Sequence, residues 1–181
     1  MGSDPHGRFV DIYERAYRPI LGYVLRRCED PDDAADVVAE TFVTAWRRID
    51  EIPPGDEARL WLYGVARRTL ANHQRGERRH ERRTAALREQ LAASPALAAP
   101  PPGEYTQFGR AFAGLSDDDR ELLSLVAWEQ LDTEQVARTL GITRNAVRVR
   151  LHRARRRFAR TLAATGIDLP LVERTAERTA P

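Results

Sequence analysis

The chain has 181 residues, 42% of them hydrophobic, and a net charge of +2 at neutral pH, so it can bury one ordinary core or two small ones. Its single cysteine, Cys28, excludes an internal disulfide, and its four histidines show no metal-ligand spacing, so we predict no metal site and no cofactor. We find no signal peptide and no apolar run long enough to span a bilayer, and we therefore expect a cytoplasmic protein with no membrane partner.

All 29 basic residues are arginines, and they are sorted along the chain rather than mixed with the acids. Residues 29–57 hold ten acidic residues, residues 59–88 hold nine arginines, and residues 135–160 hold nine arginines and no acid. Because arginine makes bidentate contacts with phosphates and bases, this alternation indicates two basic surfaces for nucleic acid, each preceded by an acidic one. GC-rich codon usage is the alternative explanation for the absence of lysine.

The hydrophobic pattern is helical nearly everywhere, so we predict an all-α protein with two small helical domains joined by a flexible proline-rich linker. The linker prediction depends on the stretch "LAASPALAAPPPGEY", which is proline-rich and aperiodic. The predicted boundaries are 8–88 for the first domain, 89–107 for the linker, 108–162 for the second domain and 163–181 for a C-terminal tail.

In the first domain, we expect a short helix and then a new helix that begins at Pro19, since proline fits the first helical turn. The next helix has Asp30 as its N-cap, runs to about Ile49 and buries a face that includes Ala35. The segment "IDEIPPGDEA" ends it, and a long helix follows from about Arg59 to the mid-eighties.

The long helix carries a basic stripe opposite its apolar face. Between Arg67 and Arg82 this stripe spans about 22 Å, the length of about six or seven base pairs. Aromatic side chains near its start are candidates for stacking on unpaired bases, although a tryptophan such as Trp46 or Trp61 is more often part of a core. An ordinary solvated arginine face is the alternative. The candidate residues of this surface are Trp61, Tyr63, Arg67, Arg68, Arg75 and Arg78.

Residues 133–160 show a helix, a glycine turn and a capped basic helix, the pattern of a helix-turn-helix that lays its second helix in the major groove. We expect Gly141 to adopt the left-handed conformation and Thr143 to cap the second helix. Val147 and Leu151 start the buried stripe, and the opposite face holds arginines without the glutamates that a merely solvated face normally carries. The candidate DNA-reading residues are Arg144, Asn145, Arg148, Val149, His152, Arg153 and Arg156.

An acidic face precedes the first basic surface. Asp33, Asp36 and Glu40 share one side of the helix that follows Asp30, and their charge would attract a basic partner helix. The three carboxylates lack a fourth ligand or a histidine, so we do not predict a metal site. An ordinary solvated acidic face is the alternative.

In this order and spacing, the blocks resemble the extracytoplasmic-function (ECF) type of bacterial RNA polymerase sigma factor, in the sigma-70 family. "DPDDAADVVAETFVTAW" is similar to the core helix of region 2, and "ARLWLYGVARRTLANHQRGERR" is similar to its promoter-melting helix. "LSDDDRELLSLVAWEQLDTEQVARTLGITRNAVRVRLHRARRRF" is similar to region 4. The resemblance covers about residues 8–162.

The resemblance implies a transcription initiation factor, not an enzyme, that binds core RNA polymerase, recognises the −35 and −10 promoter elements and promotes strand opening. It implies that residues 140–160 read the −35 element and that the helix from Arg59, with the loop before it, binds the −10 element. The β′ clamp helices and the β flap are the implied docking sites on the polymerase, and an anti-sigma factor is a further partner that the resemblance allows. The implied polymerase-binding residues are Asp36, Glu40, Val43 and Arg47.

Two positions depart from the family pattern. Ala39 stands where many relatives carry a glutamine, and Arg68 stands where many carry an asparagine, which bears on the clamp contacts and on the base captured from the −10 element. A stand-alone repressor or activator is the rival function, but it usually needs a dimer interface, and no heptad pattern or large uncommitted apolar face is evident. No glycine-rich phosphate loop or activated nucleophile supports an enzyme.

Overall fold

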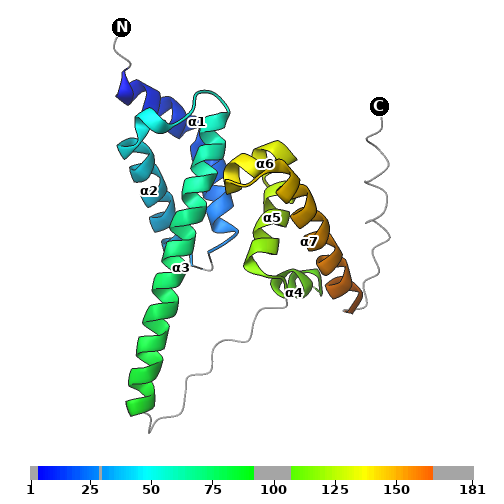
Figure 1. Cartoon of the computed structure of the whole chain (residues 1–181). Helices are drawn as coiled ribbons and strands as arrows, with labels where there is room; N and C mark the ends of the chain where they lie inside the picture. The colour runs from blue at the N-terminus through cyan, green and yellow to red at the C-terminus, as the bar shows by residue number, and fades with distance from the viewer. Residues whose placement is uncertain (1–3, 29, 92–106, 165–181) are drawn as a thin grey trace, which may run out of the picture. The chain divides into compact units, whose positions relative to one another are not determined.

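The structure is a computed structural model that describes residues 4–28, 30–91 and 107–164, with the side chains at 77–91, 107 and 108 outside the description. Every regular element in these ranges is a helix, and the chain divides into two compact units, Met1–Leu97 and Ala98–Pro181 (Figure 1). The predicted all-α fold class with two helical units is confirmed. None of the helices in the described ranges is long and apolar enough to cross a membrane.

The first unit contains α1 (Pro5–Leu25), α2 (Pro31–Arg47), the short 3-10 helix η1 (Ile49–Glu51) and α3 (Glu57–Leu91). Each of the three α-helices packs against the other two, and α3 extends well beyond them (Figure 1). The core side chains come from all three helices and include Ile20, Val37 and Leu62, each at most 1% exposed. This bundle presents the outer faces of α2 and α3 to solvent.

The predicted helix start at Pro19 is wrong, because α1 runs without a break from Pro5 to Leu25. A proline inside a helix loses one backbone hydrogen bond and strains the preceding turn. Here Ala16, Ile20 and Val24 on the same helix are at most 3% exposed. Burial of this apolar stripe against α2 and α3 outweighs the local penalty of the proline.

The N-terminus of α2 forms as predicted, since the Asp30 carboxylate accepts a hydrogen bond from the Asp32 amide at 2.8 Å. The predicted buried face is confirmed at Val38, Phe42 and Ala45, but it is wrong at Ala35, which is exposed while Ala34 is fully buried. The helix packs on both α1 and α3, so its buried arc is wider than the predicted stripe and also includes Ala34 and Val37.

The second unit contains α4 (Gln107–Ala113), α5 (Asp117–Ala127), α6 (Thr133–Leu140) and α7 (Arg144–Ala164), and α7 packs against the other three. Ser116 caps α5, with its hydroxyl accepting a hydrogen bond from the Asp119 amide at 3.3 Å. A reciprocal capping box begins α6, where Asp132 and Gln135 exchange side-chain to backbone hydrogen bonds of 2.8 and 3.0 Å.

Candidate nucleic-acid interface

The turn between α6 and α7 has the chemistry that the sequence predicts. Gly141 adopts the left-handed conformation with φ 66° and ψ 34°, and the Ile142 amide donates back to the Ala137 carbonyl at 3.1 Å. The Thr143 hydroxyl accepts a hydrogen bond from the Ala146 amide at 3.2 Å, which caps α7. The two helices therefore meet in a helix-turn-helix arrangement.

The inner face of α7 is fixed by apolar packing. Val147 and Ala154 are fully buried, Leu151 is 8% exposed, and the ring of Phe158 meets that of Phe112 in an edge-to-face contact at 5.9 Å. This buried stripe determines which side of α7 faces solvent. All seven candidate DNA-reading residues are exposed: Arg144, Asn145, Arg148, Val149, His152, Arg153 and Arg156.

The exposed residues of α7 do not all occupy the same line. At about 100° per residue, Arg156 lies within about 20° of Val149, and so does Arg160, which the sequence analysis did not single out. Arg144 lies about 140° away on the same scale and approaches Glu134 of α6 at 3.9 Å. A shallow hollow occupies the centre of the face, lined by Asn145, Arg148, Val149, His152 and Arg153.

One of the arginines of α7, Arg157, has a structural role. Arg157 donates hydrogen bonds to the carboxylate of Asp119 on α5, with Nη2 and Oδ1 2.6 Å apart. The guanidinium lowers the pKa of Asp119 through these hydrogen bonds, against the opposing effect of burial. Arg157 therefore ties α7 to α5, and the remaining arginines face outward.

The basic surface of α3 is only partly available to a ligand. Arg67 is half-buried, Arg68 is exposed, and Arg75 is exposed but donates to the Ala71 carbonyl and the Asn72 side chain at 2.9 and 2.8 Å. The side chain of Arg78 lies outside the described residues. The basic stripe of α3 therefore starts near Arg67, and the Arg75 guanidinium is held against α3 by its hydrogen bonds to Ala71 and Asn72.

The prediction that Tyr63 contacts unpaired bases is wrong for this structure, because Tyr63 is 2% exposed and its ring lies 5.1 Å from that of Tyr23 on α1. Since α3 packs on both α1 and α2, its buried arc is wider than a single stripe and includes this position. Trp61 is half-buried, and the Arg48 guanidinium lies 5.7 Å from its ring centre. Trp61 remains accessible along one side.

The outer face of α2 combines charge with exposed apolar surface. Asp36, Glu40 and Arg47 are exposed, and Val43 is 46% exposed. Trp46 beside them is also 46% exposed, although a core position was expected, because its ring packs edge-on against Phe9 of α1 at 5.2 Å instead of entering the core. This face is a mixed acidic and apolar surface.

Asp33, the third carboxylate predicted for the acidic face, also contacts α3. Its carboxylate lies 3.4 Å from His73 Nε2 on α3, and both side chains are about one-third exposed. The contact joins α2 to α3 near the start of the α3 basic stripe. The acidic surface that remains open on α2 therefore consists mainly of Asp36 and Glu40.

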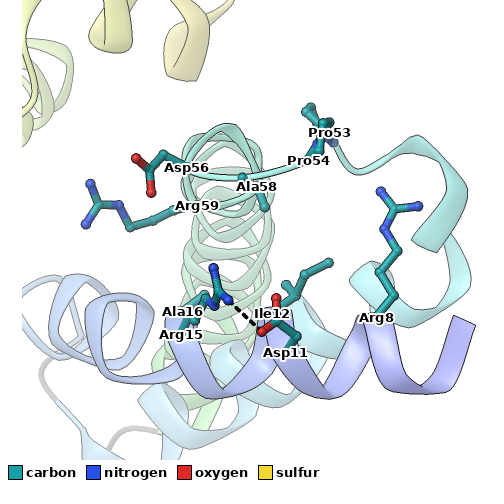
Figure 2. Close-up of a pocket in the computed structure, with 11 residues that line it drawn as sticks. Arg8, Asp11, Ile12, Arg15, Ala16, Pro53, Pro54, Asp56, Ala58 and Arg59 are labelled. Atoms are coloured by element: carbon teal, nitrogen blue, oxygen red, sulfur yellow. Dashed lines mark ion pairs between the residues drawn. The ribbon is translucent and has the colours of Figure 1, made fainter. Parts of the chain in front are cut away.

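A cavity of about 260 Å³, which no sequence pattern indicated, lies between α1 and the loop that precedes α3 (Figure 2). Its apolar lining includes Ile12 and Ala58, and Nε of Arg59 is buried without a hydrogen-bond partner among the described residues. Arg15 pairs with Asp11 at 2.9 Å, as the dashed line in Figure 2 shows. The charged residues at this cavity are Arg8, Asp11, Arg15, Asp56 and Arg59.

Comparison with known protein families matches both units. The Sigma-70 region 2 model matches residues 12–80, and the Sigma-70 region 4 model matches residues 105–158. Together these matches cover more than half of the chain, with region 2 on the α1–α3 bundle and region 4 on the helix-turn-helix unit.

Individual relatives agree with the family models. The chain is 30% identical to the ECF RNA polymerase sigma factor SigL of Mycobacterium tuberculosis, over 86% of this chain and 89% of that protein. It is 31% identical to the ECF RNA polymerase sigma factor SigF of Caulobacter vibrioides, over 77% of each chain. It is 27% identical to the RNA polymerase sigma factor YlaC of Bacillus subtilis, over 80% of this chain and 86% of that protein.

Two solved structures share the fold. The sigma factor RpoE of Bartonella quintana, in complex with the anti-sigma factor NepR, has a TM-score of 0.63 and 21% identity over 86% of this chain and 96% of that chain. CnrH, in complex with the cytosolic domain of CnrY, has a TM-score of 0.60 and 22% identity over 86% of this chain and 88% of that chain. The two matched regions and the ECF relatives together show that the chain belongs to the ECF type of the sigma-70 family. It is therefore a non-catalytic initiation factor that binds core RNA polymerase and promoter elements.

Proposed function

We propose that this sigma factor reads the upstream promoter element with the outer face of α7, holds the −10 element with α3 and its preceding loop, and docks on core polymerase through α2. The observation that carries the proposal is the outer face of α7, where exposed arginines, an asparagine and a histidine surround one valine with no acidic residue on the helix. Phosphates would neutralise the flanking arginines, and the central side chains would reach base edges.

For the −35 element, Arg148, Arg153 and Asn145 occupy the centre of the face and are the proposed base readers. Arg156 and Arg160 continue the same line toward the end of α7 and suit phosphate contacts. The ion pair between Arg144 and Glu134 makes Arg144 a peripheral contact at most. The charge and exposure of these side chains support this division of roles.

For the −10 element, the proposed surface runs from Trp61 along Arg67 and Arg68, with Arg75 and Arg78 further along α3. Tyr63 is removed from this set because it is buried. The cavity next to the loop adds Arg8, Arg15 and Arg59, whose guanidinium groups suit the phosphates of a separated strand. Arg68 in the place of a common asparagine means that base choice at −10 depends on a guanidinium here.

For polymerase binding, the outer face of α2 is the proposed contact with the β′ clamp helices. Asp36, Glu40, Val43 and Arg47 present two carboxylates, an apolar side chain and a guanidinium to a basic partner helix. The small side chain of Ala39 lies between them and leaves room for that partner. The second unit is the proposed contact with the β flap.

The domain boundaries proposed for this function are 8–88, 108–162, a linker at 89–107 and a tail at 163–181, and the linker and tail lie mostly outside the described residues. The cytoplasm is the proposed location, since core polymerase and promoter DNA are there. Both solved neighbours are complexes with an anti-sigma factor or a Cnr partner, which supports an anti-sigma factor as a regulatory partner for this chain.

The experiment that tests this function is run-off transcription by holoenzyme, reconstituted from the full chain and core polymerase, on a genomic promoter library. We expect transcripts that begin downstream of a shared upstream and −10 element, and none from core polymerase alone. Binding of the protein alone as a dimer to a palindromic site, without stimulation of the polymerase, would support the repressor or activator function instead.

A further inference from the structure

Val149 has an unusual position for an exposed apolar residue of this protein. It is 42% exposed and lies near the N-terminal end of α7, five residues after Arg144. Two other exposed apolar side chains have aromatic partners, since the rings of Trp46 and Trp128 contact Phe9 and Phe112 at 5.2 and 5.3 Å. Isolated exposed hydrophobic residues are common on protein surfaces, so the exposure of Val149 alone does not indicate a function.

Those surroundings form a ring of polar side chains. Asn145 lies four residues before Val149, His152 three residues after it and Arg153 four residues after it, so all three are its neighbours on the helix surface. Together with Arg148 they line the shallow hollow on the outer face. Because valine is short and the four surrounding side chains are longer, Val149 forms the apolar floor of this hollow.

The hollow matches one group on the edge of a base pair. In the major groove, thymine presents a C5 methyl group, and cytosine presents a C5 hydrogen at the same place. Val149 is β-branched and strongly prefers one rotamer in a helix, so contact with a methyl group costs it little side-chain entropy. The surrounding arginines and asparagine supply hydrogen bonds to neighbouring bases and phosphates.

We propose that Val149 is a specificity-determining residue of the upstream element, and that it selects thymine through the C5 methyl group. This inference rests on the proposed role of α7 in reading the −35 element. It adds a contact whose chemistry differs from the charged contacts of Arg148 and Arg153, because it does not depend on ionic strength.

Replacement of thymine by 2′-deoxyuridine tests the inference, since it removes only the methyl group and keeps the base pair. Holoenzyme made from the full chain first selects binding duplexes from a library with a randomised upstream element. Each thymine of the selected element is then replaced singly. We expect one replacement to weaken holoenzyme binding about fourfold, the value for one buried methyl group at about 0.8 kcal/mol.

The same replacement should have no effect on the Val149→Ala holoenzyme, which already lacks the apolar floor. Alanine is a better helix former than valine, so this variant keeps α7 folded, and circular dichroism checks that it does. Val10→Ala, at a 39% exposed position on α1, is the matched control and should respond to uracil like the original protein.

Three outcomes would overturn the inference. The selected upstream element could contain no thymine, or no single replacement of thymine by uracil could weaken binding. The third is that the replacement weakens binding of the Val149→Ala holoenzyme as much as that of the original holoenzyme. An Arg148→Ala holoenzyme, tested on the same duplexes, separates this failure from that of the proposed function. If Arg148→Ala weakens binding to thymine and uracil duplexes alike, only the role of Val149 is wrong. If it has no effect either, the assignment of the α7 face is wrong as well.

Discussion

Arg157 on α7 and Asp119 on α5 form a bidentate ion pair across the second unit, with a distance of 2.6 Å between Nη2 and Oδ1. The Asp119 side chain is 7% exposed, whereas that of Arg157 is 45% exposed. The pair joins residues 38 positions apart and holds the DNA-reading helix against the rest of its unit. Arg157 thus stabilises the second unit, although it lies among the arginines of the DNA-reading helix.

Asp119→Ala should lower the free energy of unfolding of the second unit by about 1–3 kcal/mol, because the charge-assisted hydrogen bonds are lost. Hydrogen exchange of the α5 and α7 amides in the full chain measures this change. Arg155→Ala is the control, since Arg155 is exposed on α7 away from Asp119 and should leave the exchange unchanged. Equal exchange in Asp119→Ala and the original protein would show that the pair does not stabilise the unit.

The same pair predicts an acid dependence of stability. The pKa of Asp119 lies below its ordinary value of 3.8 in the folded protein, so the unfolded chain takes up this proton first as the pH falls. The stabilisation by Asp119 is therefore complete at neutral pH and decreases as the pH falls through 3.8 toward the lower folded pKa. The stability difference between the original protein and Asp119→Asn should shrink in that window. A constant difference down to the lowest pH at which the unit stays folded would contradict this.

Gly141→Ala should destabilise the second unit by about 1–2 kcal/mol. The reason is that a residue with a Cβ atom is strained in the left-handed conformation that Gly141 adopts at φ 66°. Apart from Gly141 and its two chain neighbours, no residue has an atom within 4 Å of the position that the new Cβ would occupy, so steric clash does not contribute. Gly76→Ala is a matched control inside α3, where the same change should stabilise by about 0.5–1 kcal/mol. Thermal unfolding of both variants checks the opposite signs, and equal signs would contradict the account.

Reversal of charge on α2, in the double variant Asp36→Arg and Glu40→Arg, should greatly weaken capture of core polymerase without unfolding the first unit. Both carboxylates are exposed, so the expected loss comes from repulsion of a basic partner helix. Glu14→Arg on α1 is the charge-reversal control and should bind polymerase normally. A pull-down with core polymerase at fixed salt measures the effect, and normal capture by the double variant would move the docking face elsewhere.

The sequence predicted best the features that depend on residues close in the chain. The Asp30 cap, the left-handed Gly141 and the Thr143 cap each involve hydrogen bonds over five residues or fewer, and all three form. The inner stripe of α7 at Val147 and Leu151 also follows from helical periodicity alone. These local rules, together with the family resemblance, were enough for the fold class and the family.

Features that depend on packing between distant residues could not be predicted in this way. Tyr63 is buried because Tyr23 of α1 lies against it, and Pro19 stays inside α1 because its helix faces two others. Arg8, which lines the cavity beside the α3 loop, donates a hydrogen bond to the Ile52 carbonyl, 44 positions away in the chain. Helical periodicity carries no information on such pairings.

Promoter binding by holoenzymes with Arg148→Ala and Arg153→Ala together tests the central claim most directly, with Arg110→Ala, at an exposed position on α4, as the control. Both variants should assemble with core polymerase as the original protein does. The double variant should bind the upstream element far more weakly, and it should discriminate less between bases at the positions that these two arginines read. Promoter affinity and base discrimination equal to those of the control would contradict the assignment of the outer face of α7 as the DNA-reading surface.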